Sequence, residues 1–202
     1  MWGTANATLS GIPTTIPSLI NTSEGCFSIS DVSGKLMFYS DGITIWNRNG
    51  VQMLNGGSLT GHPSSAQSGI IVPYPGNPNQ YIAVTFGYGK QNNLSYSVVD
   101  MTLDNGLGGV VVGKKNIKLT GYNGMLGESL TAIRHKNRED FWIVAAGRGN
   151  PAYLNVWMVN SAGVAVTPHQ KFSTGVNIPA VENPGGYIAS SWEGDKYVWC
   201  NY

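Results

Sequence analysis

Hydrophobic and polar side chains alternate along most of this chain, and short polar clusters separate the alternating runs. Runs of this kind, bounded by Gly, Asn, Asp and Pro, are typical of strands joined by tight turns. Helical periodicity is nearly absent. The pattern predicts strands over residues 35–40, 43–46, 51–53, 69–72, 80–86, 94–99, 109–119, 130–134, 140–146, 153–159, 164–172, 187–191 and 196–202. The chain is therefore predicted to be all-β. Between the first of these strands, Asp41-Gly42 and Asn49-Gly50 predict type I′ hairpin turns.

The predicted strands fall into a repeat of a short strand, a polar turn and an aromatic-rich strand. Its four copies span residues 27–39, 70–84, 131–143 and 187–199. Copies two and three each continue with two further strands, which makes four antiparallel strands per unit, as in the blade of a β-propeller. A β-sandwich is the competing architecture, and the repeat favours the propeller. We expect one propeller-like domain over residues 1–202, with blade units at 24–66, 67–127, 128–183 and 184–202.

The fourth unit contains only two predicted strands, so two outer strands are missing. We expect residues 1–23 to form a closing segment in which Trp2 to Leu9 supply one of them. The alternative is an incomplete propeller with an open edge or face, which another chain would have to cover.

Charge and composition exclude several classes of function. Charged residues make up 11% of the chain and the net charge is +1, so there is no basic excess with which to neutralise nucleic-acid phosphates. No nonpolar run approaches the roughly 20 residues that cross a bilayer, and the first residues lack the basic and apolar regions of a signal peptide. The many Gly, Asn, Ser and Thr residues indicate a turn-rich extracellular domain.

Two cysteines, Cys26 and Cys200, lie near opposite ends of the sequence. A disulfide between them would close a loop of about 174 residues and stabilise the fold by roughly 4–5 kcal/mol. The other interpretation is two buried thiols. Neither cysteine has a CxxC partner or a nearby His, so no metal site is expected.

Polar residues precede the first strand in three of the units: Glu24, Gln67 and Glu128. First strands line the central channel of a propeller, so these residues are expected near one mouth of it. One hypothesis is a ligand or cation site made of converging oxygens. The structural interpretation, which we favour, is hydrogen bonding to backbone N–H groups of neighbouring blades.

The sequence offers little catalytic chemistry. There is no Gly-x-Ser-x-Gly motif, the three histidines do not pair at a metal-ligand spacing, and most acidic residues fall in turns. We therefore predict no catalytic residues and no cofactor. Most tryptophans lie in strands and are expected between blades. Trp192 lies in a turn and is the favoured aromatic surface for stacking on a sugar.

Three stretches carry a family resemblance: residues 24–47, residues 64–78 and residues 94–108. Together they resemble the propeller-like N-terminal module of large secreted Bacteroidetes surface proteins, many of which end in a gliding-motility-type sorting domain for type IX secretion. The resemblance covers about residues 24 to 200. It implies a location outside the cell or on its surface, and it implies no defined activity. The turn at residues 191–195 departs from the family pattern and no sorting domain follows, so we expect an excised fragment or a short stand-alone relative.

These observations predict a non-catalytic extracellular binding or adhesion scaffold, with a glycan or a surface protein as partner. The alternative is a structural virion or fibre component, encoded by a phage of such bacteria, that acts by assembling into a homo-oligomer. A glycosidase-like propeller enzyme is the second alternative.

Overall fold

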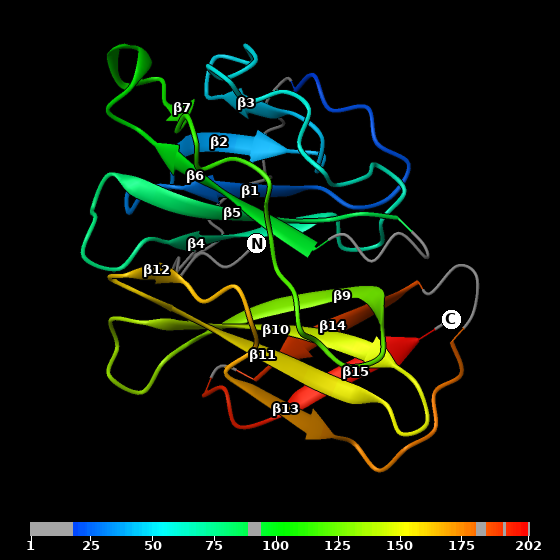
Figure 1. The fold of residues 1–202 in the computed structure, drawn as a ribbon. Coiled ribbons are helices and arrows are strands. Elements are labelled where there is room, and N and C mark those ends of the chain that lie inside the picture. The colour runs from blue at the N-terminus through cyan, green and yellow to red at the C-terminus, as the bar shows by residue number, and fades with distance from the viewer. Residues whose placement is uncertain (1–17, 89–93, 181–184, 192, 202) are drawn as a thin grey trace, which may run out of the picture.

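A computed structural model describes residues 18–88, 94–180, 185–191 and 193–201. Over these residues the chain folds into antiparallel sheets that follow one another in chain order (Figure 1). The first sheet contains β1 (Phe27–Ser30), β2 (Leu36–Ser40) and β3 (Ile45–Asn47). The fourth contains β14 (Gly186–Ser190) and β15 (Tyr197–Asn201). The prediction of an all-β fold is confirmed.

The second and third sheets share one plan. The second is ordered β4-β5-β6-β7, and the third, β12-β11-β10-β9, has the same order read from its other end. Each sheet has one extra strand that pairs the third strand in chain order: β8 pairs β6, and β13 pairs β11. The strands of the second sheet are β4 (Gly69–Pro73), β5 (Gln80–Phe86), β6 (Leu94–Asp100), β7 (Gly109–Val110) and β8 (Ile117–Lys118). Those of the third are β9 (Met125–Arg134), β10 (Phe141–Arg148), β11 (Tyr153–Asn160), β12 (Gly163–Val164) and β13 (Gln170–Ser173). A short 3₁₀ turn, η2 (Asp104–Gly106), lies between β6 and β7.

A separate hydrophobic core fills each space between consecutive sheets. Because successive side chains of a strand point to opposite faces, β5 directs Ile82 and Val84 into the core shared with the third sheet and Ala83 into the core shared with the first. In the same way β10 directs Ile143 towards the second sheet and Val144 towards the fourth. β5 and β10 are thus largely buried on both faces, which explains their long apolar runs.

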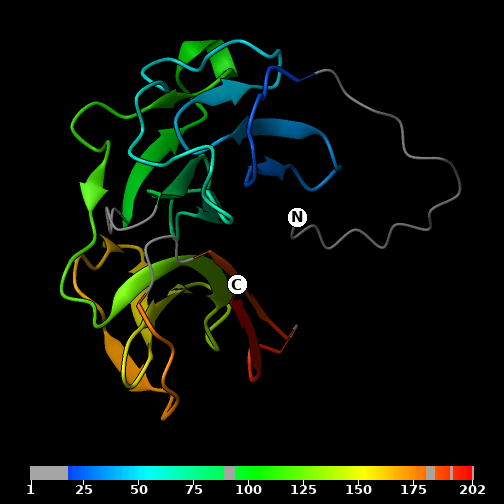
Figure 2. The same cartoon turned by 90° about the vertical axis from the view of Figure 1, so that its right-hand side faces the viewer.

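The first strands of the four sheets lie side by side in order, with β1 against β4, β4 against β9 and β9 against β14. Seen in Figure 2, the sheets follow an arc with the first and fourth sheets at its two ends. Glycines permit the close approach of these strands. A Cβ on Gly69 of β4 would lie closer than 3.0 Å to the Phe27 ring of β1, and a Cβ on Gly186 of β14 would lie 2.8 Å from the Ser129 hydroxyl oxygen of β9.

The prediction of type I′ turns is wrong at both dipeptides. A type I′ turn needs positive φ at both central residues, but only Gly42 and Gly50 have it. The Asp41 carboxylate instead accepts hydrogen bonds from the N–H groups of Ile43 and Thr44, both at 2.8 Å. The side chain therefore organises a longer loop between β2 and β3.

Other strand bounds also differ from the prediction. The strands expected over residues 109–119 and 164–172 are each divided into two short strands. β9 begins at Met125, before the predicted unit boundary at residue 128, and Glu128 has a φ of 55° within it. Residues 1–17 of the expected closing segment lie outside the described residues.

Candidate functional site

A loop before β4, residues 62–68, meets the starts of the other three first strands. The Gly25 N–H, just before β1, donates to the Ser65 carbonyl oxygen at 3.0 Å, and the Glu24 N–H donates to that of Pro63 at 3.1 Å. The Ser65 hydroxyl donates to the Phe86 carbonyl oxygen at 3.0 Å. We call residues 62–68 the hub loop.

Gln67 of the hub loop joins two other sheets. Its side-chain oxygen accepts from the Leu130 N–H of β9 at 2.9 Å and from the Ile188 N–H of β14 at 3.0 Å. Its amide nitrogen lies 3.4 Å from the Ile188 carbonyl oxygen, a longer hydrogen bond. The acceptor capacity of this side chain is thus used on backbone groups.

Glu128 reaches the hub loop from β9. Its carboxylate oxygen Oε2 accepts from the Ala66 N–H at 2.9 Å, and the residue is only 2% exposed. Glu24, by contrast, is exposed. The fold therefore brings Gln67 and Glu128 to one loop. Gln67 accepts from backbone N–H groups of β9 and β14, and Glu128 accepts from a backbone N–H group of the hub loop itself.

The remaining residues named from the sequence do not join this cluster. Trp192 lies outside the described residues. Cys26 and Cys200 are both exposed and both free, so neither the disulfide nor the buried-thiol interpretation describes them. Among the described residues, no group of three His, Cys, Asp or Glu side chains is arranged to hold a metal ion.

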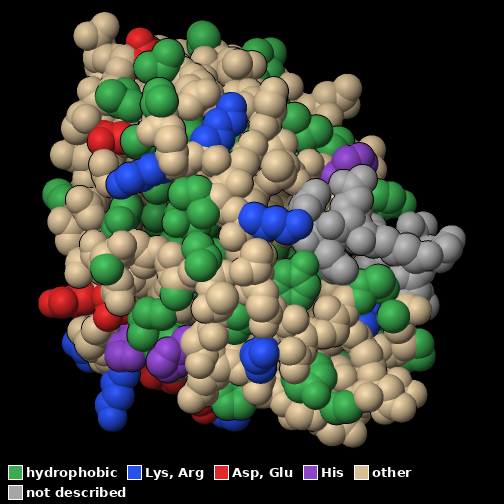
Figure 3. All heavy atoms as spheres, in the orientation of Figure 1, with side chains coloured by type: hydrophobic (Ala, Val, Ile, Leu, Met, Phe, Trp, Pro, Cys, Tyr) green, Lys and Arg blue, Asp and Glu red, His purple; other side chains and the backbone are tan. Residues whose placement is uncertain are grey.

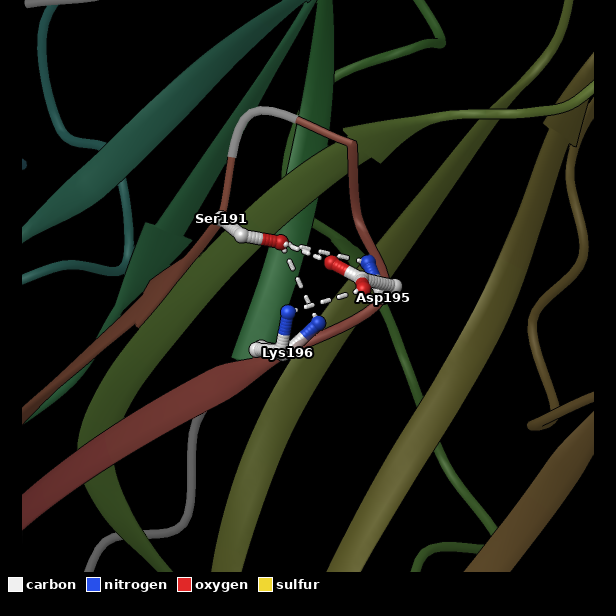
Figure 4. A network of polar contacts seen from close by, with 3 residues as sticks. All are labelled: Ser191, Asp195 and Lys196. Atoms are coloured by element: carbon white, nitrogen blue, oxygen red, sulfur yellow. Dashed lines mark hydrogen bonds and ion pairs between the residues drawn. The ribbon is translucent and has the colours of Figure 1, made fainter.

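Several aspartates are held in turns by their neighbours. Hydrogen bonds from the Ser33 side chain and the Lys35 N–H lower the pKa of Asp31. In the turn of the fourth sheet, the Ser191 hydroxyl and the Lys196 ammonium group lower the pKa of Asp195 (Figure 4). Asp195 and Lys196 form an exposed ion pair at 3.2 Å, which contributes little to stability.

Asp100 lies at the end of β6. Burial raises its pKa, but hydrogen bonds from the Thr102 hydroxyl and from the Gln80 amide together outweigh burial and lower it. The distances are 2.6 Å from Thr102 and 2.8 Å from Gln80. These carboxylates are organised to fix the backbone of turns.

An aromatic surface that the sequence did not single out lies on β10. The half-buried indole of Trp142 contacts two imidazoles, with ring centroids 5.1 Å from His135 and 5.2 Å from His169. His135 is oriented by its Nδ1, which accepts from the Asn137 N–H at 3.1 Å. We call these three residues the Trp142 cluster. Figure 3 shows histidine side chains close together at the lower left of the molecule, with charged side chains beside and below them.

The Trp142 cluster has no signal in the sequence alone. His135 follows the last residue of β9, Trp142 is the second residue of β10, and His169 lies just before β13. Only the pairing of β9 with β10, and of β10 with β13 through β11, brings the rings together. The alternation of β10 shows that Trp142 shares a face with Val144. It does not show that the fourth sheet leaves the Trp142 end of that face accessible.

The far side of the fourth sheet exposes a second apolar surface. Ile188 and Trp199 point towards the third sheet, so their neighbours on β14 and β15 point away from it. Tyr187 is 51% exposed and Val198 is 65% exposed. We call the side chains on this face, Tyr187, Ala189, Val198 and Cys200, the outer face of the fourth sheet.

Comparison with known protein families, curated proteins and solved structures finds no match to this chain. In the parts of the chain that the structure describes, no helix is long and apolar enough to span a membrane.

Proposed function

We propose that this chain is a non-catalytic binding and adhesion scaffold of propeller type that works outside the cell and takes a glycan as its ligand. The side-by-side first strands and the cores between consecutive sheets support a propeller-like arrangement of blades. The low charge and the resemblance to Bacteroidetes surface modules support a location on or outside the cell.

The observation that carries the glycan proposal is the accessibility of the Trp142 cluster. An indole binds the apolar face of a sugar ring by stacking, and imidazole N–H groups beside it can donate to sugar hydroxyls. Two imidazoles contact Trp142, and the His135 Nδ1 already accepts a hydrogen bond, which leaves its Nε2 as the donor. The cluster thus combines a stacking surface with polar groups that orient a ligand.

The described carboxylates support a binding role over a glycosidase role. A glycosidase needs two carboxyl groups that face each other across the scissile bond. Asp31, Asp41 and Asp100 instead bond groups of their own turns, and Glu128 bonds the hub loop.

A glycan array followed by titration of any bound sugar tests the proposal. We expect Trp142→Ala to weaken binding about tenfold, because a stacked aromatic contributes about 0.5–1.5 kcal/mol. The matched control is Trp46→Ala, which removes another half-buried indole, one stacked on Tyr39 in the first sheet. Thermal unfolding of both variants verifies that they fold.

Two results would contradict the proposal. A blank array with folded protein would remove the glycan as ligand. Equal loss of binding in the Trp142 and Trp46 variants would remove the Trp142 cluster as the site.

The second candidate function is assembly, as a structural virion or fibre component. The outer face of the fourth sheet favours it, because a cluster of uncharged apolar side chains exposed on one face is typical of a surface that packs against another chain. Native mass in solution separates this candidate from a monomeric scaffold.

A further inference from the structure

The fourth sheet covers only part of the third. In the core between the second and third sheets, Trp157 and Val159 of β11 belong to one cluster with Tyr96 and Val98 of β6. The third strands of both sheets therefore contribute to that core. In the fourth sheet only β14 and β15 are described, and they occupy the places of a first and a second strand.

The opposite face of β11 is consequently open in part. Leu154 and Val156 pack against the third-to-fourth core but remain half-buried. Phe172 of β13 pairs directly with Leu154 and is 51% exposed. These three uncharged side chains form a continuous surface, which we call the β11 floor.

An unpaired strand edge borders this surface. Among the described residues β15 pairs with β14 alone, and most of its side chains are exposed. A strand edge with free N–H and C=O groups is a template for another strand. Addition of a peptide to such an edge is a known mode of recognition, in which main-chain bonds give affinity and alternate side chains give specificity.

We propose that β15 and the β11 floor accept an extended strand from a partner protein. The added strand takes the third place in the fourth sheet. It bonds the edge of β15 and lays alternate side chains on Leu154, Val156 and Phe172. This protein-binding site lies on the same face of the third sheet as the Trp142 cluster, because Val156 pairs with Val144, but it uses different side chains.

The strand that holds the third place in the neighbouring sheet defines the chemistry of the partner. β11 has eight residues and, on the face that it turns towards the preceding sheet, places the bulky apolar side chains of Trp157 and Val159 at alternate positions. Residues 1–17 have their bulky apolar side chains at positions 1, 2, 9, 12 and 16, a spacing that does not alternate. A strand from another protein therefore fits the site better than this N-terminal segment.

The test uses a fluorescent eight-residue peptide, capped at both ends, with Val and Thr alternating, and measures anisotropy as the full chain is added. Two control peptides carry N-methyl groups on one or the other alternate set of amides, so one of them blocks bonding to β15 while keeping its side chains. We expect saturable binding of the parent peptide and at least tenfold weaker binding of one control.

Protein variants test the floor. Phe172→Asp places a charge on it and should weaken peptide binding at least tenfold. Val112→Asp, at an 87% exposed position before β8 in the second sheet, should leave binding unchanged. Circular dichroism verifies that both fold.

Three results would overturn the proposal. The first is that the parent peptide does not bind, and the second is that all three peptides bind equally. The third is that the parent peptide binds only after residues 1–17 are deleted. The last result would mean that the chain's own N-terminal segment fills the site. Glycan binding by Trp142 is measured separately, so its failure leaves this test intact.

Discussion

The neutral side chain of Gln67 both accepts hydrogen bonds from the backbone of β9 and β14 and donates one to the backbone of β14, which a carboxylate could not do. An amide offers an acceptor with two lone pairs and a donor, whereas a carboxylate only accepts. The Gln67 oxygen takes N–H groups from β9 and β14 together, and no charge has to be desolvated for it. At the same loop the Glu128 carboxylate accepts from the Ala66 N–H.

Replacing Gln67 should therefore cost stability. Gln67→Leu keeps the approximate size of the side chain but leaves the Leu130 and Ile188 N–H groups without their acceptor. An unsatisfied buried group costs about 1–3 kcal/mol, so for two groups we expect a loss of about 2–6 kcal/mol in the free energy of unfolding. Chemical denaturation measures it, with Gln52→Leu at an exposed position as the control. A loss no larger than that of the control would show that the bonds of Gln67 do not hold the sheets together.

Residue types predicted part of the candidate site. Gln67 and Glu128 stand out because each is a polar residue just before an apolar strand. The sequence could not show whether their side chains point to a ligand or to backbone, because that depends on how close the other sheets come. The Trp142 cluster could not be predicted, since its three rings come together only through the pairing of β9, β10, β11 and β13.

At the scale of elements, alternation in the strands was the reliable signal and turn chemistry was not. The cores of the second and third sheets follow from the alternating residues of β5 and β10. Asp41 shows why the turns were less predictable. Its carboxylate accepts hydrogen bonds from two backbone N–H groups, and these bonds stabilise a longer loop than the two-residue type I′ turn. The outer strand predicted for the second sheet is two short strands, β7 and β8, because it pairs β6 at two separate places.

The turn after β6 should respond to acid. The pKa of Asp100 is lowered from its ordinary value of 3.8 in the folded chain, so its carboxylate stabilises the fold above that pH. This stability is lost as the pH falls through the folded pKa, below 3.8. In thermal unfolding between pH 7 and pH 2, Asp100→Asn should be less stable than the unmodified chain at pH 7, and the difference should shrink at the acid end. A difference that stays constant with pH would contradict this role.

At the scale of the whole molecule, the arc of sheets ends in two unlike surfaces. On the first sheet, Tyr39 stacks on Trp46, with ring centroids 5.5 Å apart, and Ser28 and Ser30 of β1 are exposed polar residues. On the fourth sheet, the outer face is apolar. The two ends therefore do not offer the same contact to a partner.

Native mass in solution tests assembly through the outer face of the fourth sheet. If that face packs against a second copy, light scattering should give a defined multiple of 21.6 kDa. Val198→Glu should restore the monomer, because it would bury an unpaired charge. Val32→Glu, at a fully exposed position in the β1–β2 turn, should not. A monomer at every concentration, for the unmodified chain, would remove the assembly candidate.

The contacts of the hub loop also bear on how the chain reaches its native state. Gln67 bonds Ile188 across 121 positions of sequence, and Leu130 across 63. In a solenoid each repeat touches only its neighbours, so folding can begin anywhere and spread. Here one loop must find partners in sheets synthesised long after it, and such distant contacts slow folding because loop closure precedes their gain. The four sheets should consequently unfold as one cooperative unit and fold slowly for a chain of this length.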